Sequence, residues 1–222
     1  MKEKALAIVE ALKEAYPDPM CALQYEHDYQ LLIAVRLAAQ CTDERVNQVT
    51  PALFARFPTL HDFAEADIAE VEEYVHSCGF YRHKARDIVL ACQMLRDKFG
   101  GKVPDNMADL LSIPGVGRKT ANLLLGDLYA APGSVVVDTH CIRITNLLGL
   151  SKGKEPEKIE HQLRAILPRR KAPISATASS FTEEPSVWRD APSAPNAPWP
   201  PGATISTARN DWDGGCEIPN QP

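Results

Sequence analysis

The sequence predicts an all-α fold, because apolar side chains recur at helical spacing through most of the first 168 residues. Proline and glycine mark short connections between these stretches, as expected for packed helices. The run Val135-Val136-Val137 reads as a strand, and three residues are too few to build a sheet. The helices therefore have to form the core by packing against one another.

The expected helices follow one another closely along the chain. An amphipathic helix carrying Leu6 and Val9 ends before Pro17. A strongly apolar helix over 29–40 is predicted to form the buried centre of the fold. Asp43 is expected to cap the next helix. The apolar face of that helix is formed by Val46, Val49, Leu53 and Phe57. Further helices are expected at about 67–76, 83–99, 106–111, 118–130, 139–149 and 155–167.

The chain changes character after Pro168. Residues 169–222 hold nine of the 18 prolines and all three tryptophans, and helical periodicity disappears there. This composition predicts a disordered tail rather than a continuing domain.

The bulk composition indicates an ordinary globular protein. Its 222 residues, of which 45% are hydrophobic and 24% charged, suffice for one or two domains with a core. No apolar run approaches the length of a membrane span, and the charged N-terminus is unlike a secretory signal. We therefore expect a cytoplasmic monomer that does not associate with membranes.

The negative net charge is unevenly distributed. The formal net charge is −5, of which residues 172–222 carry −4. Between Leu111 and Lys171, ten basic side chains face five acidic ones, which leaves a local excess of positive charge. A local basic face matters more for contact with nucleic acid than the total charge does.

Six cysteines occur at positions 21, 41, 78, 92, 141 and 216. None has the spacing of a CxxC pair or of a Cys/His metal site. We expect buried free thiols and no metal site in the chain.

A Pro/Gly-rich turn followed by a helix start is the most informative segment. Pro114, Gly115 and Gly117 predict a tight turn with exposed backbone N–H groups, and the next helix begins near Arg118. Backbone N–H groups and a helix N-terminus together form an anion site suited to phosphate, without reading bases. The residues expected to contact a nucleic-acid backbone are Ile113, Pro114, Gly115, Val116, Gly117, Arg118 and Thr120.

Two other interpretations of this segment are available. A nucleotide-binding P-loop is excluded, because its lysine must follow a glycine and Arg118 stands at that position. A plain helix-turn-helix corner in which Lys119 is merely solvated remains open on these residues alone.

Several motifs together resemble a known family. The pattern Leu-x-x-Pro-Gly-Val-Gly-x-Lys-Thr-Ala from Leu111, followed by Val137-Asp138-Thr139-His140, resembles the helix-hairpin-helix, Gly/Pro-rich loop and aspartate signature of base-excision DNA glycosylases. Within that superfamily the chain is most similar to the endonuclease III family. Two upstream segments, residues 31–43 and 79–85, also match family motifs, so the resemblance covers about residues 1–168.

The resemblance implies a two-domain, all-α helix-hairpin-helix glycosylase fold. Residues 21–132 would form the helical domain with the hairpin, and residues 1–20 with 133–168 the remnant of a cluster domain. The implied activity is removal of oxidised pyrimidines as free bases, followed by β-elimination at the abasic site. The implied partner is double-stranded DNA with damaged pyrimidines or abasic sites, in the nucleoid of the bacterial cytoplasm.

The resemblance also implies roles for individual residues. Lys119 would be the nucleophile that attacks C1′ of the damaged nucleotide and forms a Schiff base. Asp138 would assist the attack and stabilise the oxocarbenium-like charge; alternatively it is only a helix N-cap. Gln40 and Phe80 would fill the gap left by the extruded base, although Phe80 could instead pack in the core. His140 is expected to have a structural role.

The chain departs from the family at its end. Endonuclease III holds a [4Fe-4S] cluster with C-x6-C-x2-C-x5-C, whereas only Cys216 follows Cys141 here, so no cofactor is expected in this chain. Yet the codons from Phe181 onward, read one frame over, permit His-Gly-Arg-x2-Cys-x6-Cys-x2-Cys-x5-Cys. The shifted cysteines would arise at Ser186/Val187, Ser193/Ala194, Asn196/Ala197 and Gly202/Ala203.

We hypothesise that residues from about Arg169 onward are an out-of-frame translation of an endonuclease III gene. Such a chain is expected to keep the hairpin and Lys119 but to hold Asp138 poorly, because metal-binding energy is often folding energy. Three other functions stay open: a monofunctional glycosylase, against which Lys119 argues; a non-catalytic DNA-binding module; and an inactive truncated product.

Overall fold

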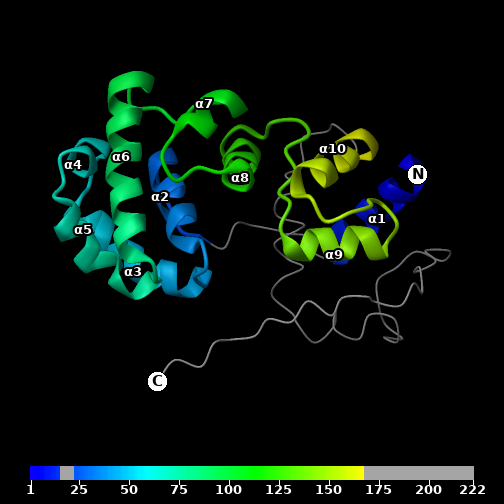
Figure 1. Ribbon diagram of the computed structural model, residues 1–222, viewed down its shortest axis with the longest axis horizontal. Coiled ribbons are helices and arrows are strands. Elements are labelled where there is room, and N and C mark those ends of the chain that lie inside the picture. The colour runs from blue at the N-terminus through cyan, green and yellow to red at the C-terminus, as the bar shows by residue number, and fades with distance from the viewer. Residues whose placement is uncertain (16–22, 168–222) are drawn as a thin grey trace.

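The structure is a computed structural model that describes residues 1–15 and 23–167 (Figure 1). Within these ranges the regular elements are all helices, which confirms the predicted all-α fold. The predicted disordered tail and its proposed change of reading frame lie outside the described residues, as do Cys21 and Cys216.

Each helix expected from the sequence is present, with ends that shift by one or two residues. The helices are α1 (Lys2–Ala15), α2 (Asp28–Ala38), α3 (Asp43–Arg56), α4 (Leu60–Ala64), α5 (Ile68–Val75), the 3₁₀ helix η1 (His76–Cys78), α6 (Tyr81–Phe99), α7 (Met107–Ser112), α8 (Arg118–Tyr129), α9 (Thr139–Leu147) and α10 (Pro156–Ile166). The short elements α4 and η1 were not expected, because neither is long enough to show a helical period.

Three local expectations are corrected. Val135-Val136-Val137 does not form a strand; the segment is irregular but buried, which explains its apolar sequence. The cap of α3 is Thr42 rather than Asp43, because the Thr42 hydroxyl accepts the N–H of Arg45 and Asp43 is already helical. Leu6 is exposed, and α1 buries Ala5 and Ile8 together with the expected Val9.

The larger of two buried clusters is formed by α2–α8 together with η1 and the segments that connect them. Helix α2 lies at its centre, with Leu31, Leu32, Ile33 and Leu37 each at most 1% exposed, as the sequence predicts.

A second cluster joins the N-terminal helix to the end of the described chain. It is formed by Ala5, Ile8, Val135, Val137, Cys141, Ile142, Ile144, Leu148, Leu150, Ile159 and Leu163. Figure 1 shows α1, α9 and α10 grouped on one side, with α8 as their neighbour from the larger group. We propose that the two clusters are the cores of two domains, divided as the sequence suggests.

Four cysteines fall within the described ranges, and all are free thiols. Cys78, Cys92 and Cys141 are buried as expected, whereas Cys41 is half-buried. Within the described ranges, no helix is both long and apolar enough to serve as a membrane span.

Candidate active site

A tight turn joins α7 to α8 and forms the predicted hairpin. The N–H of Val116 donates to the carbonyl of Ile113 at 3.1 Å, and Gly115 has a φ of +76°. A Cβ atom at Gly115 would lie 2.7 Å from Nε of Arg36. Arg36 in turn donates to Asp87 at 2.8 Å, so the turn rests on an ion pair that connects α2 with α6. Glycine is therefore required at this position by both conformation and space.

The N-terminus of α8 is open to a ligand. Its N-cap is Gly117, and no side chain in the described part of the chain caps it. The first backbone bond of the helix runs from the N–H of Ala121 to the carbonyl of Gly117, at 2.9 Å. The N–H groups of residues 118–120 thus precede that bond, and such groups with the helix dipole form an anion site.

The seven residues expected to contact a nucleic-acid backbone differ in exposure. Ile113 and Val116 are buried and support the turn from beneath. Gly115 and Gly117 are exposed, whereas Pro114, Arg118 and Thr120 are half-buried.

Lys119 and Asp138 lie together although they are 19 positions apart in the sequence. The Nζ atom of Lys119 is 3.8 Å from Oδ2 of Asp138, and the side chains are 58% and 19% exposed. The other carboxylate oxygen, Oδ1, accepts the N–H of Cys141 at 2.7 Å and caps α9. Asp138 is therefore a helix cap that also faces the lysine. The expectation that Asp138 is poorly held stays a prediction; in the structure its carboxylate caps α9.

His140 is exposed in the first turn of α9. The sequence-based expectation of a structural role for His140 stays a prediction.

Arg118 turns its side chain toward α10. Its Nε donates to Oε2 of the buried Glu160 at 2.7 Å, its Nη2 lies 3.3 Å from Oε1, and its Nη1 lies 3.2 Å from Glu157. The hydrogen bond to Glu160 raises the pKa of the Arg118 guanidinium. Any contact of Arg118 with DNA is thus left to its backbone N–H in this arrangement.

Glu160 also receives a second guanidinium. Arg164 lies 3.2 Å from its Oε1 and donates to Oδ1 of Asn122 in α8 at 3.0 Å. The side-chain amide of Asn122 donates to the carbonyl of Arg118 at 3.3 Å. We call Arg118, Asn122, Glu160 and Arg164 the α8–α10 network. Sequence analysis missed it, because the spacing of 42 residues between Arg118 and Glu160 follows no local pattern.

Gln40 and Phe80 share an unusual backbone conformation. Their φ angles are +54° and +46°, and the remaining non-glycine residue with positive φ among those described is Ala130. Such conformations are uncommon outside glycine and occur often at functional sites. Phe80 is 66% exposed, so the alternative that it packs in the core is wrong.

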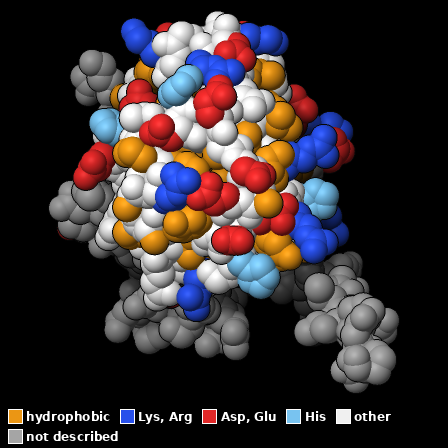
Figure 2. All heavy atoms as spheres, turned by 90° about the vertical axis from the view of Figure 1, so that its left-hand side faces the viewer, with side chains coloured by type: hydrophobic (Ala, Val, Ile, Leu, Met, Phe, Trp, Pro, Cys, Tyr) orange, Lys and Arg blue, Asp and Glu red, His pale blue; other side chains and the backbone are white. Residues whose placement is uncertain are grey.

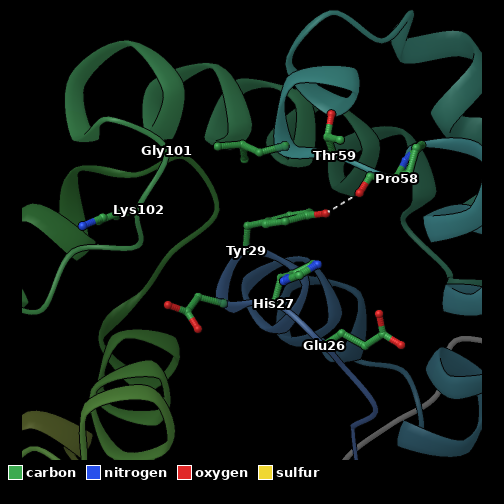
Figure 3. Close-up of a pocket in the computed structure, with 9 residues that line it drawn as sticks. Glu26, His27, Tyr29, Pro58, Thr59, Gly101 and Lys102 are labelled. Atoms are coloured by element: carbon green, nitrogen blue, oxygen red, sulfur yellow. Dashed lines mark hydrogen bonds between the residues drawn. The ribbon is translucent and has the colours of Figure 1, made fainter.

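A pocket of about 390 Å³ lies at the start of α2 (Figure 3). Tyr29 crosses it and donates to the carbonyl of Pro58 at 2.9 Å, and the ring of His27 stacks beside Tyr29. Its other labelled residues are Glu26, Thr59, Gly101 and Lys102. None of the residues predicted for the active site lines this pocket.

Figure 2 shows the side of the molecule that lies to the left in Figure 1, where α4 and α5 are found. Acidic and basic side chains alternate over this face with no continuous basic patch. Because phosphate binding is driven by clustered positive charge, this face lacks the features of a DNA-binding surface.

The four described thiols do not fit the cluster that the family resemblance implies. No group of three or more Cys, His, Asp or Glu side chains suited to a metal occurs among the described residues. Cys141 is instead part of the second core, and burial raises the pKa of its thiol to about 12. Iron–sulfur clusters need several thiolates, so no step of the chemistry is assigned to one here.

Comparison with known proteins identifies related sequences and folds. Residues 33–169 match the model of the HhH-GPD superfamily of base excision DNA repair proteins. Endonuclease III of Synechocystis is 46% identical over 76% of this chain and 77% of its own length. Endonuclease III of Escherichia coli K12 is 37% identical over 75% of this chain and 79% of its own length.

Solved structures are similar as well. A non-covalent endonuclease III–DNA complex matches with a TM-score of 0.77 and 35% identity, over 88% of this chain and 92% of the other. A thermostable thymine-DNA glycosylase, 18% identical, shares the fold with a TM-score of 0.68, over 81% of this chain and 86% of the other.

Proposed function

This chain belongs to the HhH-GPD superfamily of base excision DNA repair proteins and is a base-excision DNA glycosylase; we propose that it removes oxidised pyrimidines and cleaves the resulting abasic site through Lys119. The observation that carries the proposal is the 3.8 Å approach of the Lys119 amine to the Asp138 carboxylate. A lysine beside an acid, at an open helix N-terminus, is suited to attack a sugar carbon next to a phosphate.

The proposed reaction assigns separate roles to Lys119 and Asp138. The Nζ atom of Lys119 attacks C1′ as the bond from C1′ to the base breaks, and the base leaves with the bonding electron pair and a proton from solvent. The nitrogen then loses one proton to solvent, the C1′–O4′ bond breaks, O4′ is protonated, and a protonated Schiff base with the opened sugar remains. Asp138 stabilises the positive charge that develops on the sugar. β-Elimination then removes a proton from C2′ and breaks the C3′–O bond, with the 3′ phosphate as the leaving group, and water hydrolyses the Schiff base to free Lys119. Lys119 is more than half exposed, so DNA can approach its amine from solvent.

The hairpin is proposed to hold the DNA backbone. Exposed glycines at 115 and 117 let a phosphate approach the uncapped N–H groups at the start of α8. Such contacts carry no base information and suit an enzyme that must work at any sequence. Gln40 and Phe80 are proposed to enter the duplex as the damaged nucleotide leaves it.

Two relatives by structure support DNA as the partner, since both are endonuclease III–DNA complexes, one of them a trapped covalent intermediate. Action as a monomer on DNA in the bacterial cytoplasm stays a prediction. The competing functions are a monofunctional glycosylase and a non-catalytic DNA-binding module. In neither of them does Lys119 form a covalent bond with DNA.

Borohydride trapping on abasic duplex DNA distinguishes these functions. The lyase predicts a covalent adduct that disappears in Lys119→Ala, whereas either competitor predicts no adduct with the unaltered chain. An inactive truncated product also gives no adduct, and it differs from the binding module by failing to retain abasic DNA in a gel-shift assay.

Paired variants of Asp138 separate its two proposed roles. Asp138→Ala removes both the cap and the carboxylate, whereas Asp138→Ser keeps a capping oxygen. We expect Asp138→Ser to recover the thermal stability of the unaltered chain but not its trapping rate. Recovery of both would reduce Asp138 to a helix cap.

The proposed change of reading frame concerns residues outside the described ranges. Sequencing the gene tests it directly: codons after Arg169 that do not encode the four cysteines in the shifted frame would end the hypothesis.

A further inference from the structure

A buried lysine lies beneath the two segments that carry Gln40 and Phe80. Lys84, in the first turn of α6, is 1% exposed. Its Nζ atom donates to the carbonyls of Leu37 at 2.8 Å and Cys78 at 2.5 Å. A buried lysine is rare because desolvating an ammonium group is costly, and burial here lowers the pKa of Lys84. Its presence therefore requires a reason beyond packing.

The two carbonyls occupy equivalent places in their segments. Leu37 lies in the last turn of α2, three residues before Gln40, and Cys78 ends η1, two residues before Phe80. The N–H of Cys41 closes the end of α2 on the carbonyl of Ala38 rather than on that of Leu37. The Lys84 amine thus donates to the carbonyl of Leu37, which the turn after α2 leaves without the N–H of Cys41. Its positive charge also interacts favourably with the negative C-terminal ends of α2 and η1.

Lys84 is also tied to Phe80 through its main chain. Its N–H donates to the carbonyl of Phe80 at 3.1 Å, which starts α6. Lys84 therefore contacts the end of α2, the end of η1 and Phe80 itself. This is the kind of support that a strained conformation needs, because left-handed non-glycine residues persist only where their surroundings fix them.

We propose that Lys84 is a positioning residue for nucleotide extrusion, which holds the Gln40 and Phe80 segments at a fixed separation so that both side chains enter the duplex together. The inference rests on the proposed function, in which these two residues replace the extruded base. Lys84 is buried and does not reach the DNA, so it acts only through the two segments.

The test compares one reaction on two forms of DNA. An abasic site in a duplex must be extruded before Lys119 reaches C1′, whereas the same site in single-stranded DNA needs no extrusion. We expect Lys84→Met to lower the single-turnover cleavage rate on the duplex at least tenfold and to leave the single-strand rate within twofold. Partial unfolding would lower both rates equally, so their ratio reports positioning. Lys98→Met, at an exposed position on the same helix, is the matched control and should change neither rate.

A second variant covers the case in which Lys84→Met does not fold. Lys84→Arg keeps the charge and the donors but lengthens the side chain, so the two segments should separate and the duplex-to-single-strand ratio should fall. An unchanged ratio in the folded variants overturns the inference.

Phe80→Ala tests the premise independently. A duplex-specific loss in Phe80→Ala together with an unchanged ratio in the Lys84 variants would refute the role of Lys84 and leave the proposed function standing. If Phe80→Ala also retains the duplex rate, the premise that these residues replace the base is wrong. Absence of cleavage by the unaltered chain on both DNA forms would refute the lyase itself.

Discussion

The α8–α10 network predicts that a single buried carboxylate stabilises the helix carrying Lys119. Glu160 is 3% exposed at its side chain and receives two guanidinium groups, from Arg118 and Arg164. Replacing it with alanine leaves both arginines without their shared partner. The perturbation therefore removes the buried charged link between α8 and α10, leaves the exposed Arg118–Glu157 pair in place, and does not touch Lys119 or Asp138.

The expected cost follows from the burial of the three groups. Removing one partner of a fully buried ion pair costs about 3–5 kcal/mol. Arg118 and Arg164 are 31% and 33% exposed, and Arg118 keeps Glu157, so solvent reduces the loss. We expect Glu160→Ala to lower the free energy of unfolding by about 2–3 kcal/mol. In a chain of this size that corresponds to a fall of roughly 5–10 °C in Tm.

Thermal and urea denaturation followed by circular dichroism measure this loss. The matched control is Glu70→Ala, which breaks an exposed pair with Arg56 at 2.6 Å. An exposed pair contributes under about 1 kcal/mol, so the control should lose far less. Equal losses in the two variants would refute the argument. A double-mutant cycle of Glu160→Ala with Arg118→Met should also show coupling, because the two side chains are in direct contact.

Two further predictions concern the hairpin turn and the buried thiols. Gly115→Ala should destabilise the chain by about 1–3 kcal/mol, because φ is +76° and the new Cβ meets Arg36. Gly117→Ala, with no atom within 4 Å of its Cβ, should lose only the difference between glycine and alanine as an N-cap, about 0.5–1 kcal/mol, and a loss as large as that of Gly115→Ala would contradict this. Burial raises the pKa of the Cys92 thiol to about 12, so above pH 9 the unfolded chain loses a proton that the folded chain keeps, and stability falls as pH rises. Urea titrations at pH 8.5 and 10.5 should show a lower unfolding free energy at the higher pH, by about 1.4 kcal/mol per pH unit for each such thiol. The lowered pKa of Lys84 acts in the opposite direction and reduces this difference. An unfolding free energy that does not decrease would contradict the prediction.

The sequence predicted the long helices because each buries one face at regular spacing. Val46, Leu53 and Phe57 of the third predicted helix are buried, and α2 is apolar on all sides because it is enclosed. Helix ends were less certain, since Thr42 and Asp43 are both good capping residues and the sequence alone does not separate them. The apolar run at Val135 resembled a strand because burial, rather than strand pairing, selects its side chains.

The candidate site was predictable only where its residues belong to a local motif. Lys119 and the glycines of the turn lie in one continuous segment, and Asp138 follows at a spacing that the family resemblance supplies. Lys84 lies in another motif, yet nothing local indicates that its side chain reaches carbonyls 47 and six residues away. Long-range contacts of this kind depend on how the helices pack, so no sequence period reports them.

The structure alters what losing an iron–sulfur segment should do to this chain. The sequence-based expectation was that Asp138 would be poorly held. In the structure Asp138 is held by the cap of α9, and α10 is held against α8 by Glu160 and against the second core by Ile159 and Leu163. All of these contacts lie before residue 168, within the residues that the structure describes. A missing cluster should therefore lower the stability of the α1, α9 and α10 group more than it displaces the carboxylate, since metal-binding energy contributes to folding.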